Sequence, residues 1–354
     1  MEFYALVLII ILLLFSIGYR YPSIKKIIGL MLLAILVLIG GFRDKVGSDY
    51  ILYTNWYIKG TRDDSFEIGF LTIMKVFRCL NLDYKFLFFF FSFFTYLFVY
   101  LAIKKYSKGV SLSLILYFLI PVLFLCSFIY IRQSLSVAIA FYAFTFLLEK
   151  KYFIYFLWML LGCSFHYSCL IPFVCFFVIY LWGYSIKDYH LYILMGVTFI
   201  ISRIGIIYLI SFFLKDSHYL YYVSSKAISV PLLKLLAINL MGVLIIKYFN
   251  KRGFQYDWQR YLLLVYVCSI LFLNIFSESG ELTRVYIYFR IFEIILVADI
   301  ISHALQNRRF LLISFICCFY LFPFFRAIKI DSESSLKDDY KLAPYKTLLF
   351  KERI

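Results

Sequence analysis

The sequence lacks any long polar segment. Its longest polar stretches are 42–66 and 326–354, whereas 64% of its 354 residues are hydrophobic. A soluble domain contains roughly 45–50% apolar residues, and an excess spread over the whole chain cannot be buried in one core. We therefore exclude a separate soluble domain. Apolar runs of about 15–24 residues between short polar loops predict bilayer-spanning helices, and the alternating pattern of a β-barrel is absent.

Histidine is scarce, and motifs for metal or nucleotide binding are absent. The sequence contains no HExxH, DxD, P-loop, GxGxxG or GxSxG motif, so we predict no metal and no cofactor, and the pattern argues against an ATP-driven pump. The four histidines are widely scattered: His166, His190, His218 and His303. The eight cysteines form no CxxC pair, and we interpret them as small apolar side chains.

The charge is strongly one-sided, with 36 Lys and Arg against 20 Asp and Glu and a formal net charge of +16. In a soluble protein this excess suggests nucleic acid binding. In a membrane protein, Lys and Arg instead anchor helix ends on anionic lipid. We therefore expect membrane lipid as a partner, and no nucleic acid.

The apolar pattern predicts an all-α, polytopic membrane protein that forms a single integral membrane domain over residues 1–354. The twelve predicted spans are 3–17, 27–41, 84–103, 110–126, 130–148, 152–167, 169–184, 191–214, 231–249, 261–276, 284–303 and 310–325. A shorter amphipathic segment, 67–80, is too short and too charged to cross, so we expect it along the membrane surface.

Alternate loops differ in charge, and the positive-inside rule assigns the cationic set to the cytoplasm. The cations of that set are Arg20, Lys25, Lys26, Lys104, Lys105, Lys108, Lys150, Lys151, Lys187, Lys247, Lys251, Arg252, Arg260, Arg308 and Arg309. With twelve spans, both termini then lie outside. The outer face receives loops 42–66, 215–230 and 277–284, the C-terminal tail 326–354, and the turns near Arg132 and His166.

The segment GFRDKVGSDY, at 41–50, follows the second predicted span. Its two glycines permit tight backbone turns, and Arg43, Asp44 and Asp49 place one cation and two carboxylates at the outer face. The segment can be a ligand-binding loop or a solvated loop with a local Arg–Asp pair.

Two more polar residues lie at predicted outer helix ends. Arg132 opens the fifth predicted span, where its charge opposes the helix dipole, so it either extends to the lipid surface or binds a ligand. His166 lies in the turn between the sixth and seventh spans. It can act as a general base or a phosphate donor, although a lone histidine is more often structural.

Charged residues also mark the eleventh predicted span. Glu281, Arg284, Arg290 and Glu293 lie in or beside an apolar segment, where charges are costly and indicate function. Arg290 and Glu293 are three residues apart and can pair on one helix face. Arg284 and Arg290 point in different directions, so one can face a ligand while the other holds the fold.

In their order, spacing and expected outer position, four segments resemble the EpsG-like branch of the Wzy-type polysaccharide polymerases. They are GFRDKVGSDY at 41–50 with Tyr53 beyond it, IRQSLSVAIAFYAF at 131–144, FHYSCLIP at 165–172 and RVYIYFR at 284–290. Together they cover most of the chain.

The resemblance implies a membrane glycosyltransferase with a GT-C-like fold, located in the bacterial inner membrane with its active site facing the periplasm. Such polymerases join oligosaccharide repeat units carried on undecaprenyl pyrophosphate into O-antigen, capsular polysaccharide or exopolysaccharide. The growing chain moves onto a sugar hydroxyl of an incoming lipid-linked unit, and undecaprenyl pyrophosphate is released. The family also implies metal-independent activity and a chain-length regulator as a partner.

Within this resemblance the polar residues acquire roles. Without a metal, arginines are expected to hold the departing pyrophosphate, because guanidinium binds phosphate oxygens bidentately and stays charged; the candidates are Arg43, Arg132, Arg284 and Arg290. The candidate bases for the acceptor hydroxyl are His166 and Asp49, ranked first, followed by Asp44 and Glu281. The candidates for stacking on sugar rings are Tyr50, Tyr53, Trp56 and Tyr286, which can equally form an interfacial belt.

Other functions stay open at this point. A flippase or other transporter of lipid-linked oligosaccharides should show pseudo-symmetric halves and charges along a central path, whereas the predicted mid-span positions are nearly free of charge, with Arg203 the main exception. An O-antigen ligase is close in mechanism, and no sequence feature separates it from a polymerase. A membrane acyltransferase would need an essential histidine near a cytoplasmic acyl donor, whereas His166 is predicted to face outward.

Overall fold

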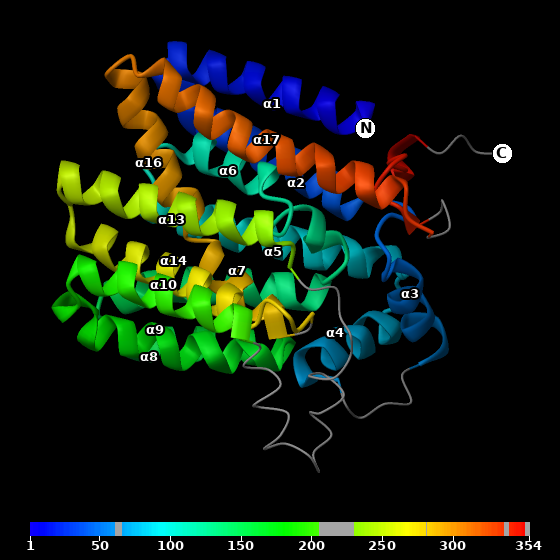
Figure 1. Ribbon diagram of the computed structural model, residues 1–354. Coiled ribbons are helices and arrows are strands. Elements are labelled where there is room, and N and C mark those ends of the chain that lie inside the picture. Colours follow the sequence, from blue (N-terminus) through cyan, green and yellow to red (C-terminus); the bar gives the residue numbers. More distant parts are fainter. Residues whose placement is uncertain (61–65, 205–229, 281, 336–339, 351–354) are drawn as a thin grey trace. The chain divides into compact units, whose positions relative to one another are not determined.

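The computed structural model describes residues 1–60, 66–204, 230–280, 282–335 and 340–350 (Figure 1). Across these ranges the regular elements are helices, together with an isolated β-bridge between Arg43 and Thr347. The chain divides into two compact units. Unit 1 comprises Met1–Phe146, Lys151–Cys169 and Val297–Ile354, and unit 2 comprises Leu147–Lys150 and Leu170–Leu296.

Many of the described helices are joined by short connections. The helices up to residue 165 are α1 (Glu2–Arg20), α2 (Lys25–Gly41), α3 (Tyr50–Lys59), α4 (Ile68–Cys79), α5 (Lys85–Tyr106), α6 (Val110–Leu119), α7 (Ile131–Leu148) and α8 (Tyr152–Phe165). The later ones are α9 (Leu170–Trp182), α10 (Asp188–Ile204), α13 (Leu232–Arg252), α14 (Asp257–Ile275), α15 (Ile287–Arg290), α16 (Glu293–Gln306) and α17 (Phe310–Ser332). Short 3₁₀ segments include η2 (Leu125–Phe128), η3 (Tyr167–Cys169) and η5 (Leu282–Tyr286).

Seven of the described helices are long and apolar enough to cross a membrane: α1, α2, α5, α7, α13, α14 and α17. Three shorter apolar helical stretches span Val110–Leu119, Tyr152–Phe165 and Tyr167–Trp182. The predicted all-α, multi-pass membrane architecture is thereby confirmed. The count of twelve crossings and the single domain over 1–354 stay predictions, and loop 215–230 lies almost wholly outside the described residues.

Three elements differ from the sequence-based expectation. Helix α6 ends at Leu119, short of the expected boundary at 126, because Pro121 disfavours helical backbone at the residue before it. Ile120 accordingly has extended backbone angles, φ −84° and ψ 104°. The predicted eleventh span is broken into η5, α15 and α16. Helix α3 forms in a segment that was expected to be a loop.

In unit 1, α2 packs closely against α5 because two glycines at its end leave room. A Cβ atom at Gly40 would lie 2.7 Å from the ring of Tyr96, and one at Gly41 would lie 2.9 Å from the ring of Phe89. Small residues of this kind let neighbouring membrane helices approach and gain dispersion contacts. A larger residue at either position would force the two helices apart.

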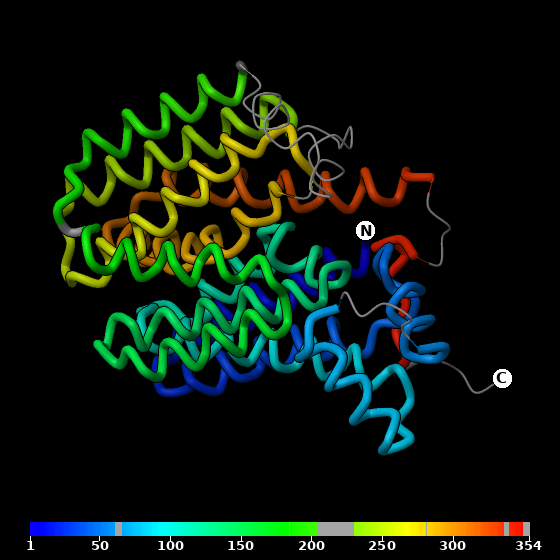
Figure 2. Tube along the Cα trace, turned by 90° about the horizontal axis from the view of Figure 1, so that it is seen from below, coloured from blue at the N-terminus to red at the C-terminus, as the bar shows by residue number. Residues whose placement is uncertain are grey.

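Helices α3 and α4 lie at the end of unit 1 where α2 finishes and α5 begins (Figures 1 and 2). Helix α4 buries Phe70 and Met74 and exposes Ile68 and Lys75, so the amphipathic helix expected at 67–80 is present. Its position along the membrane surface stays a prediction. The buried cluster on which α3 and α4 pack includes Tyr50, Tyr53, Tyr57, Phe70, Met74, Phe88, Phe91, Ile131, Leu135, Ile139 and Phe165.

Unit 2 contains a polar network between three of its apolar helices. The Asn274 side chain of α14 donates to the Thr198 hydroxyl of α10 at 3.1 Å and exchanges hydrogen bonds with Asn239 of α13 at 2.8 and 3.0 Å. Asn274 is fully buried. Hydrogen bonds of this kind hold helices together in an apolar environment, where hydrophobic burial alone gives little preference for one partner.

Arg43 is fully buried, and its guanidinium is bonded to the backbone of its own unit. Nε donates to Val46 O at 3.2 Å, Nη2 donates to Phe128 O at 3.2 Å, and Nη1 donates to Gly40 O. The rings of Phe88 and Phe128 flank the guanidinium, with Cζ 4.9 and 5.1 Å from their centroids. We call this arrangement the Arg43 clasp. It joins the end of α2 to the segment between α6 and α7.

The C-terminal segment 340–350 pairs with the loop that carries Arg43. Asp44 N donates to Lys346 O at 3.0 Å, and Leu348 N donates to Phe42 O at 2.8 Å. Tyr345 donates its hydroxyl to Ile39 O at 2.5 Å. The loop after α2 is therefore held both by the clasp and by the C-terminal segment.

Replacing Arg43 by alanine should destabilise unit 1. The change leaves buried carbonyl groups without a donor and opens a cavity between two aromatic rings, so we expect a loss on the order of 3–5 kcal/mol in the free energy of unfolding. Lysine keeps the charge but not the planar fork, so Arg43→Lys should recover only part of this loss. Thermal unfolding of the detergent-solubilised protein measures both.

Lys59→Ala serves as the control, because Lys59 is an exposed cation at the end of α3. It should unfold at the wild-type temperature. An Arg43→Ala protein as stable as the wild type would contradict a structural role for the clasp.

Candidate active site

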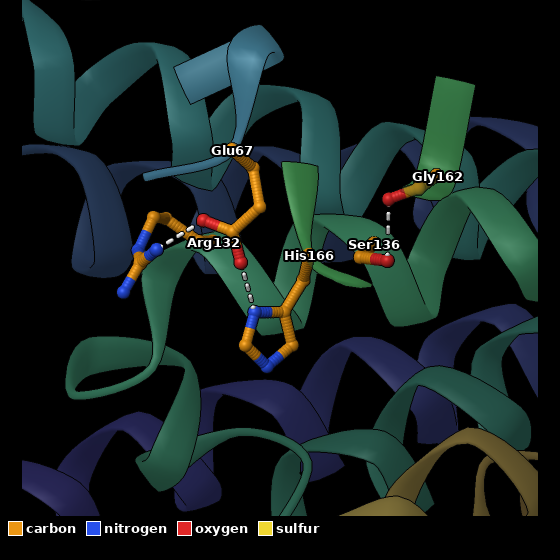
Figure 3. Close-up of polar contacts among 5 residues, drawn as sticks. All are labelled: Glu67, Arg132, Ser136, Gly162 and His166. Carbon is orange, nitrogen blue, oxygen red and sulfur yellow. Dashed lines mark hydrogen bonds and ion pairs between the residues drawn. The ribbon is translucent and has the colours of Figure 1, made fainter. Parts of the chain in front are cut away.

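Glu67 binds two polar side chains that are distant in the sequence (Figure 3). Its Oε1 atom lies 2.7 Å from Nδ1 of His166, and its Oε2 atom forms an ion pair with Nη1 of Arg132. Glu67 immediately precedes α4, Arg132 lies in the first turn of α7, and His166 follows α8. One carboxylate therefore joins three helices of unit 1.

Glycine and serine positions explain how these helix ends come together. A Cβ atom at Gly69 would lie 2.7 Å from Ser164 O, so only a residue without a side chain lets α4 approach the end of α8 this closely. On the other side, the Ser136 hydroxyl of α7 donates to Gly162 O of α8 at 2.8 Å. His166 N also donates to Gly162 O, at 3.1 Å. The backbone at the end of α8 thus fixes the position of the imidazole.

The carboxylate of Glu67 is the most buried of the three groups. Its side chain is 5% exposed, compared with 19% for Arg132 and 28% for His166. Burial alone raises the pKa of Glu67, but the hydrogen bond with His166 and the charge of Arg132 lower it more, so its pKa lies below the ordinary value of 4.5. Glu67 is therefore ionised at neutral pH.

An ionised carboxylate only accepts hydrogen bonds, so Nδ1 of His166 carries the proton in the bond to Glu67. In the neutral imidazole, Nε2 is then an acceptor. Figure 3 shows this second ring nitrogen pointing away from Glu67. The arrangement of a histidine oriented by a buried carboxylate is suited to removing a proton from a bound hydroxyl group.

Arg132 is held in an aromatic setting. Its Cζ atom lies 4.9 Å from the ring centroid of Phe66 and 5.3 Å from that of Phe70. Its Nε atom is buried and has no hydrogen-bond acceptor in the part of the chain that the structure describes. A buried N–H without an acceptor is costly, and an anionic oxygen would satisfy it.

Two of the predicted sugar-binding aromatics lie near Arg132: Tyr53 contacts it directly, and Trp56 packs against Tyr53 and Phe66. Burial raises the pKa of Tyr53, while the charge of Arg132 and a hydrogen bond between the two side chains oppose this increase. The rings of Trp56 and Phe66 have centroids 4.5 Å apart. The structure therefore brings together four predicted site residues, His166, Arg132, Tyr53 and Trp56, around Glu67.

The other predicted residues of unit 1 lie in the loop after α2. Asp49 immediately precedes α3 and accepts a hydrogen bond from the Ser48 hydroxyl at 3.1 Å, and its backbone carbonyl accepts from Tyr53 N one turn later. Asp44 is buried beside the C-terminal segment. The ring of Tyr50 stacks on Phe88 with centroids 4.3 Å apart. Arg43 is occupied in the clasp, which directs its guanidinium at the chain's own carbonyl groups.

The remaining predicted residues belong to unit 2. Arg290 and Glu293 are both buried and pair at 2.9 Å, which confirms the pairing expected from their spacing. Tyr286 is also buried, with Cζ of Arg290 5.9 Å from its ring centroid. Arg284 lies in η5 and is half-buried. Glu281 lies outside the described residues. The roles predicted for these residues stay predictions.

Sequence reasoning gave Glu67 no role. It marked the start of the segment 67–80, and the available signal was a carboxylate at the start of an amphipathic helix expected along the membrane surface. Among the described residues, no group of three or more His, Cys, Asp or Glu is arranged to hold a metal ion. Metal independence remains a prediction.

The ion pairs of Glu67 predict a pH-dependent contribution to stability. A carboxyl group whose pKa is lowered by folding stabilises the protein above its ordinary pKa, and this contribution is lost as the pH falls through the lowered value. The wild type should therefore be more stable than Glu67→Gln at pH 7, and the difference should shrink as the pH falls below 4.5. Thermal unfolding across pH 3–7 in detergent, with exposed Glu2→Gln as the control, measures the difference. A constant difference would contradict the assignment.

The comparisons with known proteins agree with the resemblance seen in the four sequence segments. The model of the EpsG family matches residues 26–347. No curated protein and no solved structure matches the chain. The matched region contains Glu67, Arg132 and His166, which we call the Glu67 cluster, and extends over most of both units. The chain belongs to the EpsG family.

Proposed function

We propose that this chain is a polysaccharide polymerase that acts at the outer face of the bacterial inner membrane. It joins oligosaccharide repeat units carried on undecaprenyl pyrophosphate and releases undecaprenyl pyrophosphate with each transfer. Membership of the EpsG family supports a polysaccharide polymerase-type function. The single observation that carries the chemistry is the Glu67 carboxylate, which orients His166 on one oxygen and binds Arg132 on the other.

In the proposed reaction His166 is the general base. Its Nε2 atom takes the proton from a sugar hydroxyl of the incoming unit, and the oxygen attacks the anomeric carbon of the growing chain. The bond from that carbon to the pyrophosphate oxygen breaks, and the pyrophosphate leaves with its negative charge. Positioned base catalysis of this kind contributes roughly 10²–10⁴-fold. The imidazolium then returns its proton to solvent or to the leaving group.

Glu67 contributes through His166. The carboxylate keeps the proton on Nδ1, so that in the neutral imidazole Nε2 is the acceptor, and it stabilises the imidazolium that forms during transfer. Because Glu67 is buried, its charge is less screened than it would be at the surface. In this proposal Glu67 positions the base and does not touch the substrate.

Arg132 is the proposed phosphate ligand in unit 1. The charge that develops on the departing pyrophosphate needs donors already in place, and Arg132, whose side chain is 19% exposed beside the proposed base, would provide them. Tyr53 and Trp56, which pack around it, would contact the adjacent sugar. We keep Arg284 and Arg290 of unit 2 as further proposed phosphate ligands, and Asp49 as the alternative base. Arg43 is not included, because its donors are bonded to backbone carbonyls.

The finer features of the sequence-based prediction belong to the same proposal. These are twelve crossings with both termini outside, a GT-C-like fold, an active site open to the periplasm, activity without a divalent metal, and a chain-length regulator in the same membrane. The placement of His166, Arg132 and Glu67 at the ends of helices in unit 1, not in their middles, favours chemistry at the membrane surface. It does not favour a path through the bilayer, as a flippase would need.

Deletion of the gene should reduce the surface glycan ladder to a single repeat unit, because export and attachment continue while polymerisation stops. Complementation with His166→Ala should leave the ladder absent, whereas exposed His190→Ala should restore it. Gel electrophoresis of the surface glycan, with immunoblotting of the membrane fraction for protein level, gives the result.

Each other pattern points to a different function. Loss of even the single unit, with lipid-linked precursor inside the cell, would indicate a flippase. Polymer accumulating on the lipid carrier outside would indicate a ligase. A normal ladder in the deletion strain would rule out all three.

Arg132 should tolerate lysine poorly if it binds pyrophosphate. Arg132→Lys keeps a positive charge for Glu67 but cannot present the planar fork to a phosphate, so we expect about 10²-fold lower polymer formation with little change in unfolding temperature. Synthesis from purified lipid-linked repeat units measures the rate. Exposed Lys75→Ala on α4 is the control. Wild-type activity in Arg132→Lys would exclude bidentate phosphate binding.

A further inference from the structure

Unit 1 carries an open hollow at the C-terminal end of α4, the end opposite Glu67. Its volume is about 560 Å³, and its lining residues are Tyr57, Ile58, Arg78, Asn81, Leu82, Asp83 and Tyr84. This volume is within the range of roughly 300–1,000 Å³ found for small-molecule sites. None of these residues has a part in the chemistry described above.

The lining combines one partly exposed ring with planar polar groups. The ring of Tyr84 is half-buried, and the side chains of Asn81 and Asp83 are exposed. Leu82 contributes its backbone carbonyl, which accepts the Tyr57 hydroxyl at 2.6 Å. An aromatic face beside an amide and a carboxylate can receive the apolar face of a sugar ring and its neighbouring hydroxyl groups.

The hollow is fixed rigidly to the helices that form the candidate active site. Arg78, at the end of α4, donates from Nε to Tyr57 O at 2.6 Å and from Nη2 to Trp56 O at 2.7 Å. These carbonyl groups are at the end of α3, where a cation is favoured by the helix dipole. The ring of Trp56 packs against Phe66 beside Arg132. Both sites therefore share α3 and α4 as supports.

The spacing of the two sites follows from helix geometry. Glu67 precedes the first turn of α4, and Arg78 lies in its last turn. With a rise of about 1.5 Å per residue, the two residues are separated by about 16 Å along the helix. A linear glycan that reacts near His166 would extend over several sugar units before reaching the hollow.

We propose that this hollow is a carbohydrate subsite that holds a sugar of the glycan several units away from the reacting bond. The inference rests on the proposed polymerase function. A phosphate headgroup is the less suitable occupant, because the Asp83 carboxylate lines the hollow and Arg78 is bonded to backbone carbonyls. Binding energy from a remote part of the substrate helps to hold the reacting end in place. The subsite retains the chain between transfers and so influences its final length.

Two substitutions remove the sugar contacts and keep the backbone. Asn81 has a left-handed backbone with φ +52°, which glycine adopts freely, so Asn81→Gly removes the amide and leaves the turn. Tyr84→Ala removes the ring. Asp83 is kept, because its carboxylate accepts Lys85 N at 2.9 Å at the start of α5. Lys75→Ala, on the same helix but outside the hollow, is the control.

The binding experiment uses the His166→Ala protein in nanodiscs, so that catalysis plays no part. The probes are oligosaccharides of two or more repeat units, released from the surface polysaccharide of the source strain, and glycerol phosphate as a headgroup analogue. Calorimetric titration should show glycan binding that Asn81→Gly and Tyr84→Ala each weaken by about tenfold, the equivalent of a lost hydrogen bond or stacking contact. Lys75→Ala should bind as tightly as the parent.

In cells, the two variants on the wild-type background should give shorter ladders, while the amount of glycan with two repeat units stays unchanged. Equal glycan affinity in parent and variants, or binding of glycerol phosphate in preference to glycan, would overturn the subsite. A deletion strain with a normal ladder would overturn the polymerase function, whatever the titration shows. The carbohydrate subsite and the polymerase function are therefore contradicted by different measurements.

Discussion

A carboxylate that is almost fully removed from solvent must be paired, and the arrangement of the helix ends around Glu67 in unit 1 depends on how this requirement is met. Each of its oxygens has one partner, and the two partners come from α7 and from the turn after α8. Removal of either partner would leave a buried charge only partly compensated, which typically costs several kcal/mol. The two ion pairs that compensate the charge of Glu67 also orient the imidazole of His166 and the guanidinium of Arg132. The same contacts therefore serve both stability and the proposed chemistry.

Local patterns predicted the helices well, because hydrophobic runs and breaks are properties of neighbouring residues. The same reasoning could not identify Glu67. Its partners are 65 and 99 residues away, and their proximity depends on Gly69 allowing α4 to approach α8. Arg132 and His166 were recognised separately, each by its expected position at an outer helix end. Their common partner, Glu67, could be identified only from the packing of the helices in the structure.

Arg43 and Arg132 show why residue type alone does not assign a role. Both follow or begin an apolar helix, and both lie between two aromatic rings. The donors of Arg43 are directed at three backbone carbonyls, whereas Arg132 pairs with a carboxylate and, among the described residues, keeps one buried donor without an acceptor. The sequence provides the guanidinium in both places. The surrounding backbone determines whether the guanidinium donors bond to carbonyl groups of the protein or are available to a ligand.

The pairing of the C-terminal segment with the loop after α2 has a consequence for biosynthesis. The Thr347 hydroxyl donates to Phe42 O, a contact between residues 305 positions apart. Because the chain is made from its N-terminus, the loop after α2 is synthesised while nearly all of the later helices are still to be inserted. During most of translation the loop therefore lacks its contacts with the C-terminal segment 340–350. The contacts between the loop after α2 and the segment after α17 therefore form only after α17 has been inserted. They join residues about 300 positions apart, so this part of the protein assembles late and at the entropic cost of closing a long stretch of chain.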